Sequence, residues 1–295
     1  MIVCPLCGKE LAESAESYIC GGCGKVYRVN NGTPDLAASQ EEGQGGFKEE
    51  FFDEFHEKER TNFWHNGRKN IIYNLIRKYS KPGGRLIELG CGSGNIIEFL
   101  NRRGIPIEGG DIFQKAIEYA KKKFPAKFYR LDLNELPFRE EFDAIGLFDA
   151  LEHIEDDSKA LRNIRRGLKK DGLLYITVPA GKNLWSNYDE FYCHKRRYDK
   201  SELEAKLGEA GFEVVKMSFY VFFLYPAVYL TRKHSARYKN SKAELNKSDA
   251  VDAPPVINSV LSAIMMIEAL IIRYVNLPIG SSLIAVAKKI PEFEK

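Results

Sequence analysis

Two clusters in this sequence have the residue types and spacing needed for chemistry, and the first consists of paired cysteines. The pairs are Cys4 and Cys7, then Cys20 and Cys23, each separated by two residues and followed by glycine. Four thiolates in two C-x-x-C pairs are the ligand set of a closed tetrahedral zinc site. All four ligands come from the chain, which favours a structural over a catalytic metal. The alternative is a set of free or redox-active thiols.

A glycine-rich turn near the middle of the chain is the second cluster. Residues 85–100 read R-L-I-E-L-G-C-G-S-G-N-I-I-E-F-L, with Glu88 ahead of Gly90, Gly92 and Gly94. The pattern predicts a strand, a tight turn and a helix. Glycines let the backbone turn sharply and let a ligand lie against it, at the carboxyl end of a central strand. The order E-x-G-x-G-x-G differs from the dinucleotide fingerprint G-x-G-x-x-G.

Two further acids follow predicted strands. Asp111 ends the strand expected at Ile105–Gly110. It lies about 20 residues beyond the turn, where a carboxylate can accept hydrogen bonds from ribose hydroxyls. The alternative role is a helix N-cap, which Asp also fills well. Asp132 directly follows the strand expected at Lys127–Leu131.

Strands and helices alternate on either side of these residues. The repeat of strand, turn and helix predicts an α/β domain with a doubly wound parallel sheet. An amphipathic helix is expected at Phe63–Tyr79, before the first strand of the sheet, and the final strand is expected at Ser281–Lys289. The other expected elements are strands at Glu141–Phe148, Gly172–Val178 and Gly211–Tyr220 and helices at Gln114–Lys123, Asp157–Leu168 and Ser201–Ala210.

The glycine turn resembles motif I of the class I S-adenosylmethionine (SAM) methyltransferases. The segment Asp149–Ile154, D-A-L-E-H-I, is similar to a stretch common in their type 11 group. The resemblance covers about Phe63–Val178 and implies a seven-stranded Rossmann-like sheet that binds SAM. In this family the acid after the third strand, here Asp132, pairs with the adenine amino group. The SAM-binding residues that the resemblance implies are Arg68, Glu88, Gly90, Cys91, Gly92, Asp111, Ile112, Asp132, Leu133 and Phe148.

One of these residues rests on a looser resemblance. In ubiquinone-biosynthesis O-methyltransferases, which this region resembles loosely, an arginine just before such a helix meets the SAM carboxylate. Arg68 stands in that place. The alternative is an ordinary surface arginine.

Three side chains are candidates for removing a proton from a methyl acceptor. His153 could be a general base, or a hydrogen-bonded histidine that holds its loop, and the structural role is favoured. The run H-K-R-R-Y supplies His194 and Tyr198, and its cations could bind a phosphate or carboxylate. Alternatively its arginines pair with acids and Tyr198 packs under the next helix. The run resembles methyltransferases found among bacterial polysaccharide and lipid-linked sugar enzymes.

The chain divides into three parts. Residues 1–36 resemble a zinc ribbon and are too few to form a core without a metal. Residues 37–62 form a linker and an acidic helix, expected to be solvated with a buried stripe of phenylalanines. Residues 63–295 form the methyltransferase domain, with a hydrophobic and basic insertion at 221–278 before the last strand. This insertion is too long for a plain loop.

The insertion combines an aromatic and aliphatic run at Tyr220–Leu230, a basic stretch at Thr231–Lys247 and an apolar helix at Val256–Val275. The first run is too short to span a bilayer, and charges in the apolar helix argue against a span. Apolar elements that flank a basic stretch fit a peripheral membrane contact through 220–275. They also fit a lid over a hydrophobic substrate, a dimer interface or ordinary core.

The composition limits which partners and which cellular location are expected. Lys and Arg number 44 against 41 Asp and Glu, for a formal net charge of +3. This near balance does not require nucleic acid as a partner. The first residues lack a charged segment followed by an apolar core, so no signal peptide is expected. The cysteine pattern suits a reducing cytoplasm.

The expected function is SAM-dependent methyl transfer to a small-molecule or lipid-linked acceptor, at oxygen. SAM and structural Zn²⁺ are the expected cofactors, in the cytoplasm or at the inner face of the membrane. Two alternatives remain at this point. One is an rRNA methyltransferase, because zinc modules also precede rRNA guanine methyltransferase cores. The other is a non-catalytic SAM-binding docking protein.

Overall fold

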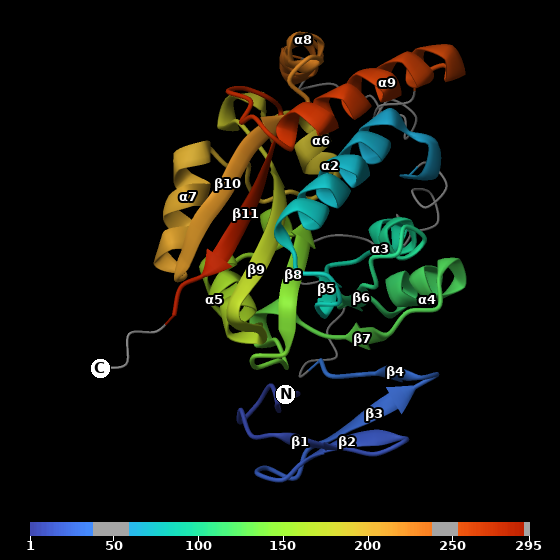
Figure 1. The fold of residues 1–295 in the computed structure, drawn as a ribbon, viewed down its shortest axis with the longest axis vertical. Coiled ribbons are helices and arrows are strands. Elements are labelled where there is room, and N and C mark those ends of the chain that lie inside the picture. The colour runs from blue at the N-terminus through green and yellow to red at the C-terminus, as the bar shows by residue number, and fades with distance from the viewer. Residues whose placement is uncertain (38–58, 238–252, 292–295) are drawn as a thin grey trace.

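Two sheets organise the computed structural model, which describes residues 1–37, 59–237 and 253–291. A four-stranded sheet at the N-terminus lies against the edge of a seven-stranded sheet (Figure 1). The acidic helix expected within 37–62 falls largely on residues outside the described ranges. The boundaries expected between the three parts of the chain stay a prediction.

The seven-stranded sheet has the order β10-β11-β9-β8-β5-β6-β7. Strands β5 to β9 run parallel, whereas β11 is antiparallel to both of its neighbours. The strands are β5 (Leu86–Leu89), β6 (Glu108–Asp111), β7 (Phe128–Arg130), β8 (Phe142–Phe148), β9 (Leu168–Pro179), β10 (Phe212–Tyr220) and β11 (Ser282–Lys289). The expected α/β sheet is confirmed. Chain order reverses between β5 and β8, so the ligand crevice is expected at the carboxyl end of β5.

Helices cover both faces of this sheet, as buried apolar stripes require. One face carries α2 (Phe63–Tyr79), α3 (Asn95–Asn101), α4 (Gln114–Lys123) and α9 (Pro255–Ile272). The other carries α5 (Asp157–Gly167) and α7 (Lys200–Glu209). The short elements η1 (Leu133–Glu135), η2 (Leu151–His153), η3 (Lys182–Leu184) and α6 (Asn187–Phe191) complete the loops.

The N-terminal sheet is antiparallel and joins the edge of the larger one. Its strands are β1 (Leu11–Glu13), β2 (Ser17–Cys20), β3 (Val26–Asn30) and β4 (Thr33–Pro34). Just past β4, the amide of Leu36 donates to the carbonyl of Arg130 in β7, at 2.8 Å. Leu36 is fully buried in the same apolar cluster as Tyr129 of β7. The N-terminal module therefore covers an edge strand that would otherwise present unpaired backbone groups.

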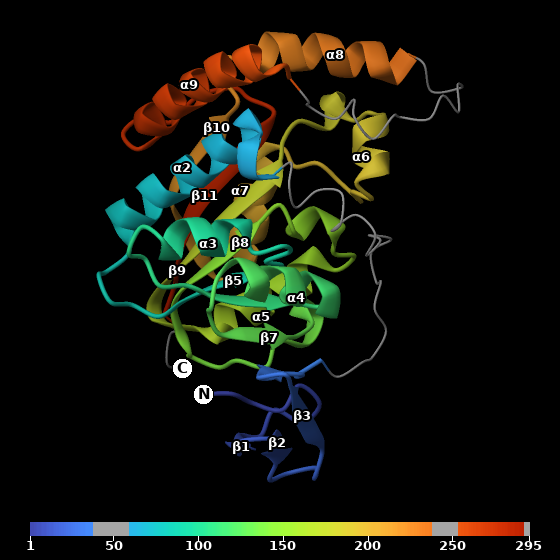
Figure 2. The same cartoon turned by 90° about the vertical axis from the view of Figure 1, so that its right-hand side faces the viewer.

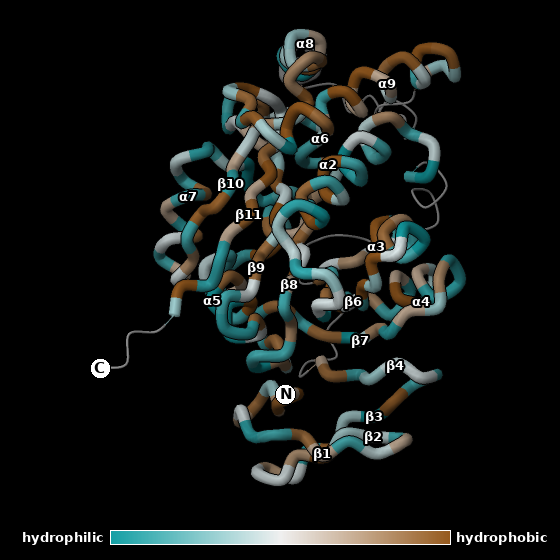
Figure 3. Tube along the Cα trace, viewed as in Figure 1, coloured by the Kyte–Doolittle hydropathy of each residue, from teal (hydrophilic) through white to brown (hydrophobic). Residues whose placement is uncertain are grey.

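The described part of the insertion forms two helices that lie across one end of the sheet (Figure 2). Helix α8 (Tyr225–Arg237) joins the aromatic run to the start of the basic stretch, and α9 packs on α2. In the described part of the chain, α9 is the one helix long and apolar enough to cross a membrane, and only 22% of it is buried. Its hydropathy is visible in Figure 3. Its exposed apolar residues are Val256, Ile257, Val260, Met266, Ile267 and Leu270.

Two strands begin more than one residue away from the expected position. The strand β6 begins at Glu108 rather than Ile105, consistent with Pro106, which has no amide hydrogen for a sheet hydrogen bond. The strand β9 begins at Leu168, because Leu168 pairs with Phe142 before the register shifts. Both differences lie away from the carboxyl ends of the strands.

Candidate functional site

A cavity of about 670 Å³ lies at the carboxyl ends of β5, β6 and β8. Its size falls in the range usual for small-molecule sites. All ten residues expected to bind SAM line it, and so do His153 and His194. Residues of α8 and α9, including Val228 and Leu261, line its opposite side. The structure thus brings together nearly all of the predicted site residues.

The glycine turn has a backbone that other residues would strain. Gly90 has φ +68°, and a Cβ there would lie 2.8 Å from Cβ of Ala150. Gly94 has φ +74°, and a Cβ there would lie 2.6 Å from Cβ of Ala120. Positive φ and these close approaches explain why glycine occupies both positions. The backbone of the turn therefore packs closely against Ala150 and Ala120.

Asp111 holds this turn in place. Its carboxylate accepts hydrogen bonds from the backbone amides of Gly92 at 2.8 Å and Phe113 at 3.0 Å. Burial raises the pKa of Asp111, and the bonds from the two amides oppose that rise. Asp132 makes the equivalent local bond, accepting from the amide of Asn134 at 2.8 Å. Each carboxylate therefore caps its own loop and also faces the cavity.

Glu88 is the acid at this end of the cavity whose charge is least compensated. It is 3% exposed, and its Oε2 has no hydrogen-bond partner among the described residues. Burial raises its pKa well above the ordinary value, and the charge of Arg68 only partly opposes this. A cationic ligand group placed beside Glu88 would restore the ionised form.

Arg68 lines the cavity but is already paired. Its guanidinium forms an ion pair with Asp149 and lies 4.8 Å from the ring centroid of Trp64. The side chain is buried, so it is not the surface arginine considered as the alternative. Contact between Arg68 and a SAM carboxylate stays a prediction.

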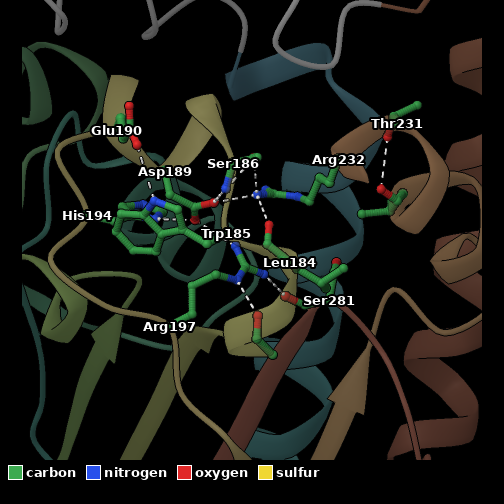
Figure 4. Close-up of polar contacts among 12 residues, drawn as sticks. Leu184, Trp185, Ser186, Asp189, Glu190, His194, Arg197, Thr231, Arg232 and Ser281 are labelled. Atoms are coloured by element: carbon green, nitrogen blue, oxygen red, sulfur yellow. Dashed lines mark hydrogen bonds and ion pairs between the residues drawn. The ribbon is translucent and has the colours of Figure 1, made fainter. Parts of the chain in front are cut away.

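At the other end of the cavity, the lining residues His194, Arg197 and Arg232 surround a buried acid, Asp189 (Figure 4). Its carboxylate lies 2.7 Å from Arg197, 2.7 Å from Arg232 and 3.0 Å from Nδ1 of His194. Burial alone would raise the pKa of Asp189, but the hydrogen bond from His194 and the two arginines lower it below its usual value. These contacts join α6, the segment after it and α8.

Asp189 is the important residue that the sequence analysis missed. A local signal existed, because Ser186 and Asp189 form a capping box, in which the acid at the third position bonds back to the cap amide. The arginine partners lie 8 and 43 residues further along the chain, a distance that no local pattern reveals. Arg197 pairs with an acid, which was the alternative given for the run H-K-R-R-Y.

Tyr198 is the one candidate that the structure keeps out of the cavity. Its side chain is fully buried, and its hydroxyl donates to Asp157 at 2.9 Å. Burial and the charge of Asp157 raise the pKa of this hydroxyl. Tyr198 does not line the cavity, so it lies where a core residue would, not where a base is needed.

The two candidate histidines lie together beside Glu152. The ring centroids of His153 and His194 are 5.0 Å apart, and Nε2 of His194 lies 4.0 Å from a carboxylate oxygen of Glu152. Burial and the neighbouring His194 lower the pKa of His153 to about 4. His153 is therefore neutral at physiological pH.

The four N-terminal cysteines come together as the spacing predicts. Each offers a sulfur within 4.8 Å of the other three. The amides of Gly22 and Cys23 donate to Sγ of Cys20 at 3.3 and 3.4 Å. The bond from the Cys23 amide is the chief reason that the pKa of Cys20 falls to about 6. A clustered, partly ionised set of thiols is the donor set that zinc prefers.

Comparison with known proteins bears on the family. The model of the family described as a methyltransferase domain matches residues 63–217, slightly more than half of the chain. A ubiquinone biosynthesis O-methyltransferase of Pelagibacter ubique is 32% identical over 121 residues, covering 38% of this chain and 50% of that protein. The chain spans about half the length of the first curated relatives it matches.

Solved structures agree on the fold. A complex of the Haloferax volcanii Trm112 methyltransferase activator with a methyltransferase matches with TM-score 0.56 at 18% identity, covering 84% of this chain and 99% of that one. A SAM-dependent methyltransferase from Thermotoga maritima matches with TM-score 0.50 at 19% identity, covering 83% and 99%. With the matching domain, the fold and the glycine turn in place, the chain belongs to the SAM-dependent methyltransferases.

Proposed function

We propose that this protein transfers a methyl group from SAM to an oxygen atom of a small-molecule or lipid-linked acceptor. The observation that carries the proposal is the single cavity that joins two sets of residues. Glu88, Asp111 and Asp132 line one end, and His153 and His194 line the other. A cofactor and an acceptor bound at these ends would lie close enough for direct transfer.

At the cofactor end, this chain's own groups match the parts of SAM. Carboxylates of Asp111 and Asp132 suit ribose hydroxyls and an adenine amino group, because both accept hydrogen bonds. Glu88, whose Oε2 has no hydrogen-bond partner among the described residues, suits the cofactor's ammonium group. SAM supplies an already activated methyl group, so these residues need only bind and orient it.

At the acceptor end, the proposal of oxygen as the methylated atom is supported by the ubiquinone O-methyltransferase relatives, at 32% identity and below over partial lengths. His153 is neutral and lines the cavity, so it can accept a hydrogen bond or a proton from an acceptor hydroxyl. Its low pKa makes it a weak base.

A lipid-linked acceptor is proposed because of α8 and α9. Leu224, Val228 and Leu261 line the cavity, while Ile267 and Leu270 of α9 are more than half exposed. These helices thus present apolar side chains both to the cavity and to the outside. That arrangement suits an enzyme that lies on the cytoplasmic face of a membrane and takes its acceptor from it.

Methyl transfer can be tested with tritium-labelled SAM. The zinc-replete full chain is first assayed for SAM binding by calorimetry, with micromolar affinity expected. It is then incubated with labelled SAM and either a lipid extract or an aqueous extract of bacterial cells. Label should enter the lipid fraction as an oxygen-bound methyl group. Absence of SAM binding, or transfer to nitrogen or carbon, would overturn the proposal.

Membrane contact has a separate test. Sedimentation with vesicles of phosphatidylcholine and phosphatidylglycerol should carry the protein into the pellet. The double variant Ile267→Ser and Leu270→Ser should stay in the supernatant, because it removes exposed apolar area from α9. Val215→Ser, which changes a 44% exposed residue on β10, is the matched control and should still sediment. Equal sedimentation of all variants would contradict the contact.

A structural Zn²⁺ is proposed for Cys4, Cys7, Cys20 and Cys23. The clustered sulfurs fit such an ion, and its binding would contribute to folding of a module this small. Elemental analysis should find one zinc fewer per chain in Cys20→Ser than in the wild type, and the wild-type content in Cys193→Ser. Equal zinc content in Cys20→Ser and the wild type would argue against this site.

A further inference from the structure

We propose that Glu152, His153 and His194 bind a divalent transition-metal ion at the acceptor end of the cavity. This site is separate from the cysteine cluster and differs from it in donor chemistry. Binding of the ion stands on the geometry alone, whereas its role in methyl transfer rests on the proposed function.

The first observation is convergence. Glu152 and His153 come from η2, and His194 comes from the segment after α6, some 40 residues further on. Each offers one ligand atom, and these atoms all lie within 4.8 Å of one another. All three residues line the cavity. Two imidazoles and a carboxylate on one side of a cavity form the donor set of metal sites with open positions.

The second observation is a buried carboxylate that has no hydrogen-bond partner among the described residues. Glu152 is 0% exposed, and neither of its side-chain oxygens has a hydrogen-bond partner among the described residues. An unpaired buried carboxylate is costly, and proteins usually pair such groups or use them to hold metals. The nearest ion-pairing atom is Nε2 of His194, at 4.0 Å, which is too far for a hydrogen bond.

The third observation is the orientation of His194, shown in Figure 4. Its Nδ1 lies 3.0 Å from Asp189, which also accepts from Arg197 and Arg232. Because Asp189 is an acceptor held by two cations, the proton between it and His194 lies on Nδ1. In the neutral ring Nε2 then carries the lone pair, 4.0 Å from a carboxylate oxygen of Glu152. A carboxylate that fixes the ring of a histidine in this way is the usual outer partner of a metal-binding imidazole.

These contacts define what the ion would do. Three protein ligands leave coordination positions open toward the cavity, where an acceptor hydroxyl can bind. A bound cation lowers the pKa of that hydroxyl, so its proton can pass to water without a strong base. The freed oxygen forms a bond to the methyl carbon while the bond from that carbon to sulfur breaks. S-adenosylhomocysteine, the methylated acceptor and one proton are the products. His153 then acts as a ligand, and it need not accept the proton itself.

The test uses Mn²⁺, which prefers nitrogen and oxygen ligands and does not compete for four thiolates. The full chain, with its cysteine cluster filled with zinc, is titrated with Mn²⁺ and followed by electron paramagnetic resonance. One Mn²⁺ should bind per chain. Glu152→Gln should weaken this binding at least ~100-fold, since it removes the charged ligand. His194→Gln should weaken it similarly.

Glu155→Gln is the matched control. Glu155 lies three residues from Glu152 but is exposed and pairs with Lys195, so Mn²⁺ affinity should be unchanged. Each variant is checked for SAM binding, which reports on folding. Failure of the wild-type protein to bind Mn²⁺ while it binds SAM would overturn the metal site. Equal affinity of Glu152→Gln and wild type would overturn it too. Mn²⁺ binding without methyl transfer would leave the site standing and count against the proposed function instead.

Discussion

The two ends of the cavity are built in different ways. At the cofactor end, Asp111 and Asp132 accept hydrogen bonds from backbone amides two residues ahead or across the glycine turn. At the acceptor end, Asp189 is held by side chains from two other segments. The first end depends on local backbone geometry, and the second on charges that meet only when the domain folds.

Because of this difference, substitutions at one end should mainly affect SAM binding, and substitutions at the other should mainly affect the stability of the fold. Removing an acid at the cofactor end leaves backbone amides that water or a ligand can reach from the cavity. Removing Asp189 leaves Arg197, which is 2% exposed, without its counter-charge. Substitutions at the two ends should therefore change different measured quantities.

The largest effect is expected for Asp189→Asn. Loss of one member of a buried ion pair costs about 3–5 kcal/mol of the free energy of unfolding, because an uncompensated charge remains buried. Urea denaturation at pH 7 measures this cost. Glu190→Gln, at the exposed neighbouring position, is the control and should change the unfolding free energy by less than about 0.5 kcal/mol.

The pH dependence of the free energy of unfolding should also report the contribution of Asp189. The pKa of Asp189 is lowered in the folded state, so its contribution is complete above the unfolded pKa of about 4. The contribution is lost as the pH falls from about 4 toward the folded pKa. The wild type should therefore lose more stability than Asp189→Asn as the pH falls, because the variant has no carboxylate at this position to protonate. Equal stability of Asp189→Asn and wild type at pH 7 would remove the distinction between the two ends.

The next largest effect is expected for Asp111→Ala, on SAM affinity. A hydrogen bond to a charged group contributes about 1.5–3 kcal/mol, and the glycine turn also loses its anchor through Gly92. We expect SAM to bind roughly 100-fold more weakly, measured by calorimetry, with the circular dichroism spectrum unchanged. Unchanged affinity would show that the ribose site lies elsewhere.

Glu88 provides a smaller, pH-dependent effect at the cofactor end. Burial holds its pKa above the ordinary value, so the folded protein without SAM keeps this proton to a higher pH than the unfolded chain does. Binding of a cationic ammonium group favours the ionised form. SAM affinity should therefore rise with pH, by up to about tenfold per unit, until Glu88 is ionised in the free protein.

Glu88→Gln should flatten this dependence, because the amide does not titrate. Calorimetry in two buffers with different ionisation enthalpies should also show that SAM binding releases a proton in the wild type. A pH profile identical in wild type and variant would assign the cationic group of SAM to another residue.

The same contrast explains what the sequence could predict. The strands, the glycine turn and the acids after β6 and β7 follow from short-range patterns, so their positions around the cavity were foreseeable. Tyr198 and Arg197 were ambiguous, because a run of cations looks the same whether it faces a ligand or a buried acid. Asp189 and Glu152 gave little signal, since their importance comes from partners in distant segments or from the lack of them.

The sequence also predicted only part of the N-terminal module. Its cysteine spacing predicted the metal cluster, but the backbone bond from Leu36 to Arg130 depends on how two folded units meet. That contact places the module at the strand that leads to Asp132. It therefore adds to the comparison, because the cofactor end also receives support from a separate module, besides the bond between Gly92 and Asp111.

The smallest effect tests that support. Asp35 accepts from Arg130 at 2.9 and 3.2 Å, and Arg130 also donates to the carbonyl of Ile112 at 3.1 Å. Asp35→Ala should cost about 1 kcal/mol, since the pair is partly buried. If loss of the pair shifts Arg130, and with it the loops of Ile112 and Asp132, SAM affinity should fall by about fivefold at most.

Arg102→Ala is the matched control for this substitution, because Arg102 pairs with Glu98 on the surface of α3 and is 62% exposed. It should leave both stability and SAM affinity within error of wild type. A fall in affinity for Asp35→Ala alone would mean that the N-terminal module helps to position the adenine side of the cavity. Identical affinities would mean that the module only covers the edge of β7, and that the cofactor end does not depend on it.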